Sequence, residues 1–144
     1  MQTVADILSS KGNTVWTISP EATVYDALTM MAEKNVGALV VVRRDEILGL
    51  ISERDYARKV ILQGKSSRQI PVTEIMTTNV HFVRLGQNIE ECMEEMTDKR
   101  VRHLPVIDNE RLAGIISIGD VVKAIIDNQD ATIKHLENYI TGGR

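Results

Sequence analysis

The hydrophobic and polar positions of the chain form the same pattern twice, with an offset of 65 residues. In each copy, a short apolar segment is followed by apolar residues spaced three and four positions apart, then by two apolar runs separated by a polar turn. Spacing of three and four is typical of one helix face, whereas short apolar runs between turn residues are typical of strands. Each copy is therefore predicted to form a strand, a helix, a hairpin of two strands and a second helix.

The predicted elements match one to one between the copies. The first helix of each copy begins after a capping residue, Thr23 or Asn88, and the second begins near Ser52 or Ser117. The predicted strands lie at 15–18, 38–42 and 47–51 in the first copy and at 80–83, 103–107 and 112–116 in the second. The core face of the first helix is formed by Val24, Ala27, Leu28 and Met31 in one copy and by Ile89, Cys92, Met93 and Met96 in the other.

The repeat divides the chain into two units with an α/β (α+β) fold. We predict a first repeat at 4–64, a linker at 65–70, a second repeat at 71–127 and a helical tail at 128–144. Because about 60 residues bury only a marginal core, the repeats are expected to pack through their sheets around a pseudo-two-fold axis. A helix should continue over 125–140, where Ile133, Leu136 and Ile140 recur at helical spacing and need a partner from this chain or a second one.

Composition argues against several classes of protein. The 144 residues are 43% hydrophobic, which is too high for a disordered chain, yet no apolar run approaches the roughly 20 residues of a membrane span. A net charge of −3 and an aromatic content of 3% argue against a nucleic-acid binder. A lone cysteine, Cys92, cannot form an internal disulfide, and the N-terminal segment lacks the pattern of a signal peptide. We therefore expect a soluble cytoplasmic protein.

A Gly-x-x-Ser-x-x-Asp segment occurs in both copies, where a predicted strand ends and a helix begins. It runs from Gly49 to Asp55 in the first copy and from Gly114 to Asp120 in the second. The free N–H groups at a helix start favour a phosphate, and a carboxylate there can accept from both hydroxyls of a ribose. Ser-x-x-Asp is also close to an ordinary helix capping box, which explains most single copies. Duplication at a constant offset favours a binding site.

The whole repeat resembles the CBS domain, named after cystathionine β-synthase, and the two copies resemble the paired CBS (Bateman) module. The resemblance covers about residues 4–127 and rests on the order and duplication of several short segments. They are Ile7-Leu8 and Ile75-Met76, Gly37 to Val41, Arg102 to Val106, and both Gly-x-x-Ser-x-x-Asp segments. The tail from Leu136 to Gly142 is similar to that of stand-alone bacterial CBS-pair proteins.

The resemblance implies regulatory binding of an adenosine-containing ligand, with AMP as the leading candidate and ADP, ATP, NAD(P)(H) or S-adenosylmethionine as others. It also implies that each cleft takes its serine and aspartate from one repeat and the residues around adenine from the other. Carried onto this sequence, the first site comprises Ser52, Arg54, Asp55 and Arg58 with Val83, Val101, Arg102, His103 and Pro105. The second comprises Ser117, Gly119 and Asp120 with Ile18, Val36, Gly37 and Ala38.

The two implied sites differ in charge. The first offers Arg54, Arg58 and Arg102, whose guanidinium groups suit phosphates, whereas the second has no arginine at the matching positions. We therefore expect the first site to bind the nucleotide more tightly. That expectation would fail if Asp120→Ala abolished AMP binding while Asp55→Ala left it intact. A solvated helix face explains Arg54 and Arg58 equally well, and His103 could equally be a satisfied strand residue.

We predict a ligand-sensing regulator rather than an enzyme, because nothing in the sequence supplies a nucleophile with a positioned base. His81, His103 and His135 lack partners at metal-ligand spacing, so no metal is predicted. The chain is expected to carry no effector domain, so the signal would pass to an unknown regulated protein or to a change in assembly, with a homodimer as the predicted state. The alternatives are a structural or dimerisation module with vestigial clefts, a small enzyme acting on a nucleotide, and a nucleic-acid binder.

Overall fold

The computed structural model describes residues 2–140, except for the side chains of residues 131, 132, 139 and 140. Residues 141–144 of the predicted tail lie outside the described residues. The chain forms two compact units. One, the continuous unit, is Thr14–His81; the other, the composite unit, joins Met1–Asn13 to Phe82–Arg144.

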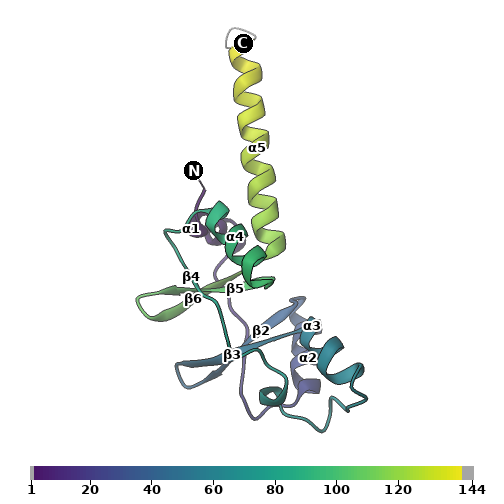
Figure 1. The fold of residues 1–144 in the computed structure, drawn as a ribbon. Helices are drawn as coiled ribbons and strands as arrows, with labels where there is room; N and C mark the ends of the chain where they lie inside the picture. Colours follow the sequence, from purple (N-terminus) through teal and green to yellow (C-terminus); the bar gives the residue numbers. More distant parts are fainter. Residues whose placement is uncertain (1, 141–144) are drawn as a thin grey trace. The chain divides into compact units, whose positions relative to one another are not determined.

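Each unit contains a three-stranded mixed sheet, so the predicted α+β class is confirmed (Figure 1). In both sheets the first strand runs parallel to the second, and the second and third form an antiparallel hairpin. The strands are β1 (Thr17–Ile18), β2 (Ala38–Arg43) and β3 (Glu46–Ser52) in the continuous unit, and β4 (Val83–Arg84), β5 (His103–Asp108) and β6 (Arg111–Ser117) in the composite unit. The hairpins agree with prediction. Strand β1 covers only the last two residues of the predicted 15–18, and β4 overlaps the predicted 80–83 only at Val83 and continues to Arg84, since each pairs with the next strand over two residues only.

The first helix of each copy begins where the sequence predicts. Helix α2 (Val24–Lys34) is capped by Thr23, which accepts from the Asp26 N–H at 3.1 Å, and α4 (Ile89–Lys99) is capped by Asn88, which accepts from Glu91 at 2.8 Å. The predicted core faces are buried at Val24, Ala27 and Met31 in α2 and at Ile89, Cys92 and Met96 in α4. The other two predicted residues, Leu28 and Met93, are half-buried and pack against the same cores. Burial, with Glu91 and Glu95 nearby, raises the pKa of the Cys92 thiol to about 11, which keeps it protonated and unreactive at neutral pH.

The second helices of the two copies differ in length. In the continuous unit, α3 (Glu53–Tyr56) passes into a π-helical turn, η1 (Ala57–Ile61). In the composite unit, a single helix, α5 (Ile118–Ile140), covers both the predicted second helix and the predicted helix at 125–140. Figure 1 shows its C-terminal half extending beyond the other helices of its unit. No helix within residues 2–140 is long and apolar enough to span a membrane.

The two compact units exchange N-terminal segments, because each contains the N-terminal segment of one sequence repeat and the hairpin of the other. Helix α1 (Val4–Lys11) belongs to the first repeat by sequence, yet Val4, Ile7 and Leu8 lie in the hydrophobic core of the composite unit. The segment around η2 (Val72–Glu74), which opens the second repeat, contributes Val72 and Ile75 to the core of the continuous unit. The boundaries 4–64 and 71–127 therefore describe repeats of sequence, and as domain limits they stay a prediction.

The glycine of each Gly-x-x-Ser-x-x-Asp segment lies against the exchanged segment. A Cβ atom on Gly114 would lie 2.8 Å from the Leu8 side chain of α1. A Cβ atom on Gly49 would lie 2.7 Å from the Thr77 carbonyl oxygen, which follows η2. These approaches are closer than carbon contacts allow, so both glycines are explained by packing within their own units rather than by a ligand.

Candidate functional site

Both Ser-x-x-Asp segments form reciprocal helix caps. Ser52 Oγ accepts from the Asp55 N–H at 3.2 Å, and Asp55 Oδ2 accepts from the Ser52 N–H at 3.0 Å. Ser117 and Asp120 repeat this arrangement at the start of α5, at 3.2 and 2.8 Å. The capping interpretation that the sequence left open is therefore present in the structure. Ligand binding would have to use acceptors that remain after capping.

The Asp55 carboxylate is buried and engaged through both oxygens. Its Oδ1 accepts from Thr77 Oγ1 at 3.3 Å and pairs with Lys59 Nζ at 3.1 Å, while Oδ2 accepts from Ser52 N–H and Oγ. Lys59 also donates to the Ile75 carbonyl at 2.9 Å. With 12% of its side chain exposed, Asp55 ties the exchanged segment to the start of α3.

The Asp120 carboxylate keeps one oxygen available. Its Oδ2 accepts from the Ser117 N–H at 2.8 Å and from Lys11 Nζ at 2.6 Å, while Oδ1 accepts no hydrogen bond from the described residues. Its side chain is 23% exposed. Burial raises the pKa of Asp120, but the Lys11 ammonium and the backbone and side chain of Ser117 outweigh this, and the net pKa lies below the ordinary value.

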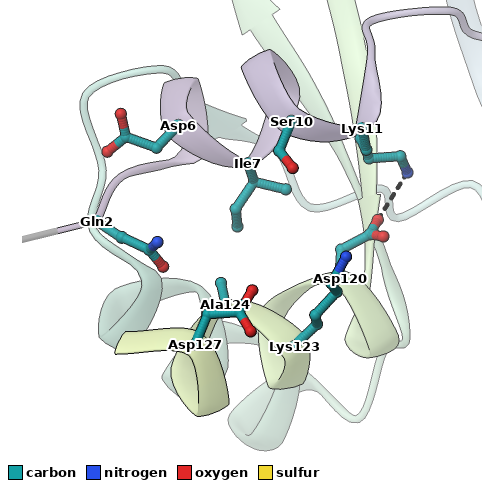
Figure 2. Close-up of a pocket in the computed structure, with 9 residues that line it drawn as sticks. All are labelled: Gln2, Asp6, Ile7, Ser10, Lys11, Asp120, Lys123, Ala124 and Asp127. Carbon is teal, nitrogen blue, oxygen red and sulfur yellow. Dashed lines mark hydrogen bonds and ion pairs between the residues drawn. The ribbon is translucent and has the colours of Figure 1, made fainter. Parts of the chain in front are cut away.

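A pocket of about 130 Å³ opens beside Asp120, between α1 and α5 (Figure 2). Lys11, from α1, spans one end of it and also donates to the Ile115 carbonyl at 3.0 Å. The pocket is lined by Gln2, Asp6, Ile7, Ser10, Lys11, Asp120, Lys123, Ala124 and Asp127. Ligand pockets commonly measure roughly 300–1,000 Å³, so this space alone is too small to enclose a nucleotide.

A second pocket, of about 350 Å³, lies in the continuous unit at the C-terminal end of α2. It includes two residues of the second implied site, Val36 and Gly37, together with Glu53 at the start of α3. The Glu53 N–H donates to the Gly37 carbonyl at 3.1 Å, which fixes this loop beside the Ser52 cap. Its other lining residues are Leu28, Met31, Ala32 and Asn35.

Within each unit, the strand residues of the implied sites lie beside the motif of their own repeat. Ala38 pairs with Ser52 across the continuous sheet, and His103 pairs with Ser117 across the composite sheet. The Ile118 N–H donates to the Arg102 carbonyl at 2.8 Å. The remaining implied residues are Ile18 in β1, Val83 in β4, Val101 after α4, Pro105 in β5, Gly119 in α5, Arg54 in α3 and the exposed Arg58 in η1. The partnership of each motif with strand residues of the other repeat stays a prediction.

Sequence reasoning missed both lysines that contact the motif aspartates. Lys59 could have been found, because it lies four residues after Asp55 on a helix, a spacing at which opposite charges meet. Lys11 gave no such signal, because it lies 109 positions from Asp120 in the sequence. Within the described part of the chain, no three His, Cys, Asp or Glu side chains gather as metal ligands would.

Comparison with known proteins gives consistent matches along the chain. A family model for the CBS domain matches residues 4–62 and 72–127. The mitochondrial CBS domain-containing protein CBSX3 of Arabidopsis thaliana is 40% identical over 151 residues, which cover 98% of this chain and 73% of the relative. A solved structure from Burkholderia ambifaria MC40-6, of a CBS-domain protein with an ascribed role in signal transduction, is 51% identical with a TM-score of 0.85, covering 89% of this chain and 96% of that one.

Two more distant solved structures concern assembly and ligands. The hexameric CBS-CP12 protein of bloom-forming cyanobacteria is 32% identical with a TM-score of 0.76, covering 83% of this chain and 70% of that one. The CBS domain pair of protein MJ0100, in complex with 5′-methylthioadenosine and S-adenosyl-L-methionine, is 23% identical with a TM-score of 0.78, covering 89% of this chain and 98% of that one. At 23% identity, the similarity to the MJ0100 structure shows a shared fold only.

Proposed function

Because the chain belongs to the CBS-domain family, we propose that it is a regulatory module that binds an adenosine-containing nucleotide beside its Ser-x-x-Asp motifs. CBS-domain proteins of this type are regulatory modules rather than enzymes. The observation that carries the proposal is the Asp120 carboxylate, ionised at neutral pH, with Oδ1 accepting no hydrogen bond from the described residues. A carboxylate oxygen in that state suits a ribose hydroxyl.

The proposed ligand is AMP, with ADP, ATP, NAD(P)(H) and S-adenosylmethionine as the other members of its class. Its ribose would donate to a motif aspartate, and the residues around adenine would come from the opposite repeat, in the two sets that the sequence implies. The CBS pair of MJ0100 supports the class, because a module of this fold holds two adenosine compounds. The ligand can regulate only through different affinities for two states, which a partner protein or the assembly would detect.

Thermal unfolding with a ligand panel tests this function. At about a hundred times its dissociation constant, a bound nucleotide should stabilise the chain by roughly 2.7 kcal/mol and raise the melting temperature visibly. The panel comprises AMP, ADP, ATP, NAD⁺, NADH, NADPH, S-adenosylmethionine and GTP, with Asp55→Ala and Asp120→Ala beside the unmodified protein. A shift with an adenine compound that one aspartate variant abolishes supports the proposal. No shift with any compound, and no co-purifying nucleotide, contradicts it.

A structural or dimerisation module is the second candidate function. It is favoured by Asp55, whose two oxygens already accept from Ser52, Thr77 and Lys59 and leave little capacity for a ribose. The small volume beside Asp120 points the same way. Under this function, the two motifs would serve only as helix caps.

We also propose that the chain forms a homodimer through α5. The side chains of Val122, Ile126, Ile133 and Leu136 are 41–54% exposed and lie four, seven and three residues apart, which aligns them along one face. Isoleucines seven apart with a leucine three residues further on match the a and d positions of a two-stranded coiled coil. The hexameric CBS-CP12 protein supports self-association in proteins of this fold.

A double substitution on this face tests the homodimer. Ile133→Glu with Leu136→Glu would place charges on the proposed seam, so light scattering should fall from the mass of a dimer to about 16.1 kDa. The matched control, Lys134→Glu, lies off the seam and should leave the mass unchanged. A monomeric unmodified protein at micromolar concentration would contradict the proposal.

A further inference from the structure

Lys11 places a positive charge against the carboxylate that carries the proposed function. Its ammonium lies 2.6 Å from Asp120 Oδ2, and a second hydrogen bond, to the Ile115 carbonyl at 3.0 Å, holds it there. Figure 2 shows Lys11 approaching Asp120 from α1, while Asp120 lies at the start of α5. Since both carboxylate oxygens belong to one small group, a ribose that donates to Oδ1 would lie next to this ammonium.

The charged side chains around the pocket determine how much Lys11 affects the binding of an anionic ligand. Asp6, Asp120 and Asp127 line it together with Lys11 and Lys123, so the five side chains sum to about one negative charge. Asp6 Oδ2 already accepts from the Thr3 N–H and hydroxyl. Without Lys11, three carboxylates would face one ammonium, the net charge would change from about −1 to about −2, and an anionic ligand would be repelled more strongly.

We propose that Lys11 is a specificity-determining residue at Asp120, where it selects an adenosine ligand that carries phosphate on its ribose over a neutral or cationic adenosine compound. The inference rests on the proposed function and narrows its ligand class. In AMP the substituent on the ribose 5′ carbon is a phosphate, in adenosine it is a hydroxyl, and in S-adenosylmethionine it bears a sulfonium. The ammonium attracts the first, is indifferent to the second and repels the third.

The Asp55 motif provides an internal control. Lys59 contacts Asp55 as Lys11 contacts Asp120, but Asp55 is more buried and both of its oxygens are engaged within the continuous unit. The inference therefore assigns ligand selection to Lys11 and a structural role to Lys59. This departs from the expectation, drawn from arginine content, that the first site binds more tightly.

Titration calorimetry at low salt with AMP, adenosine and S-adenosylmethionine tests the inference on the full chain. The unmodified protein should bind AMP about tenfold more tightly than adenosine, the size expected for one partly screened charge pair, and S-adenosylmethionine most weakly. Lys11→Gln should remove most of that tenfold difference by weakening AMP and leave the affinity for adenosine within about twofold. Lys11→Arg, which keeps the charge, and Lys59→Gln should both retain the preference.

The outcomes separate this inference from the function on which it rests. If none of the three compounds binds the unmodified protein, the proposed function fails. If AMP and adenosine bind equally, or Lys11→Gln keeps the preference, or Lys59→Gln abolishes it, the function survives and the role of Lys11 is wrong. If Lys11→Arg behaves like Lys11→Gln, the lysine acts through its shape rather than its charge, which also overturns the inference.

Discussion

Gly49→Ala should lower the free energy of unfolding by about 1–3 kcal/mol, the range for overpacking a filled site. The new Cβ would lie 2.7 Å from the Thr77 carbonyl oxygen and 2.9 Å from the Met76 sulfur. The carbonyl belongs to the backbone and cannot rotate away as a side chain can. Relief would require separating Thr77 from Leu50, which are joined by reciprocal backbone hydrogen bonds of 2.9 and 2.8 Å.

Chemical denaturation with two further alanine variants measures this effect. Gly114→Ala should cost less, because the added carbon meets the flexible end of Leu8. Gly86→Ala is the matched control, since no described atom lies within 4 Å of its Cβ position, and its effect should stay within about 0.5 kcal/mol. Equal stability of all three variants would show that the close approach to Thr77 does not constrain residue 49.

Asp55→Ala should destabilise the chain by about 2–4 kcal/mol, more than Asp120→Ala. The change removes a helix cap, worth about 1 kcal/mol, and buried hydrogen bonds to a charged group, worth about 1.5–3 kcal/mol. Asp120 is more exposed and its partner Lys11 is itself 34% exposed, so the loss there should be nearer 1 kcal/mol. Urea unfolding of both variants provides the comparison, and a cost at Asp55 no larger than at Asp120 would contradict the assignment of Asp55 as a structural tie.

The contribution of Asp120 should depend on pH in a defined direction. Its pKa in the folded chain lies below the ordinary value, because the Lys11 and Ser117 interactions outweigh the burial that raises it. A carboxyl group of this kind stabilises the fold above its unfolded pKa of about 3.9, and the contribution disappears as pH falls through the lower folded value. The stability gap between the unmodified protein and Asp120→Asn should therefore be full at pH 7 and vanish in strong acid.

Local features of the fold were predictable from the sequence because their causes lie within a few residues. The caps Thr23 and Asn88 bond N–H groups three positions ahead, and each hairpin turn joins strands that are neighbours in the chain. The two-residue turns contain Arg44, Asn109 and Glu110 at positive φ, a backbone state compatible with tight hairpins. Because the two copies match at a constant offset, an element predicted in one copy also predicts the matching element in the other.

The exchange of segments and the lysine contacts were not predictable in this way. A repeat offset says which segments resemble each other, but it does not say which core each segment joins. Ile7 and Ile75 occupy matching places in the repeat, yet each completes the unit that contains the other copy's hairpin. The Lys11 contact follows from that exchange. Because the sequence did not reveal the contact, the Asp120 motif was predicted to have less positive charge around it than the structure shows.

The exchange also sets an order of events during synthesis on the ribosome. Thr14–His81 is one uninterrupted stretch, so the continuous unit can complete its core as soon as that stretch has emerged. Lys11 must wait for Asp120, 109 positions later, which takes roughly 5–20 s at ordinary elongation rates. An isolated eight-residue helix such as α1 has only marginal stability in water. The side chains of Ile7 and Leu8 are therefore exposed to solvent during that interval. Nascent chains should therefore be most open to chaperone capture at α1, until the segment through Asp120 has been made.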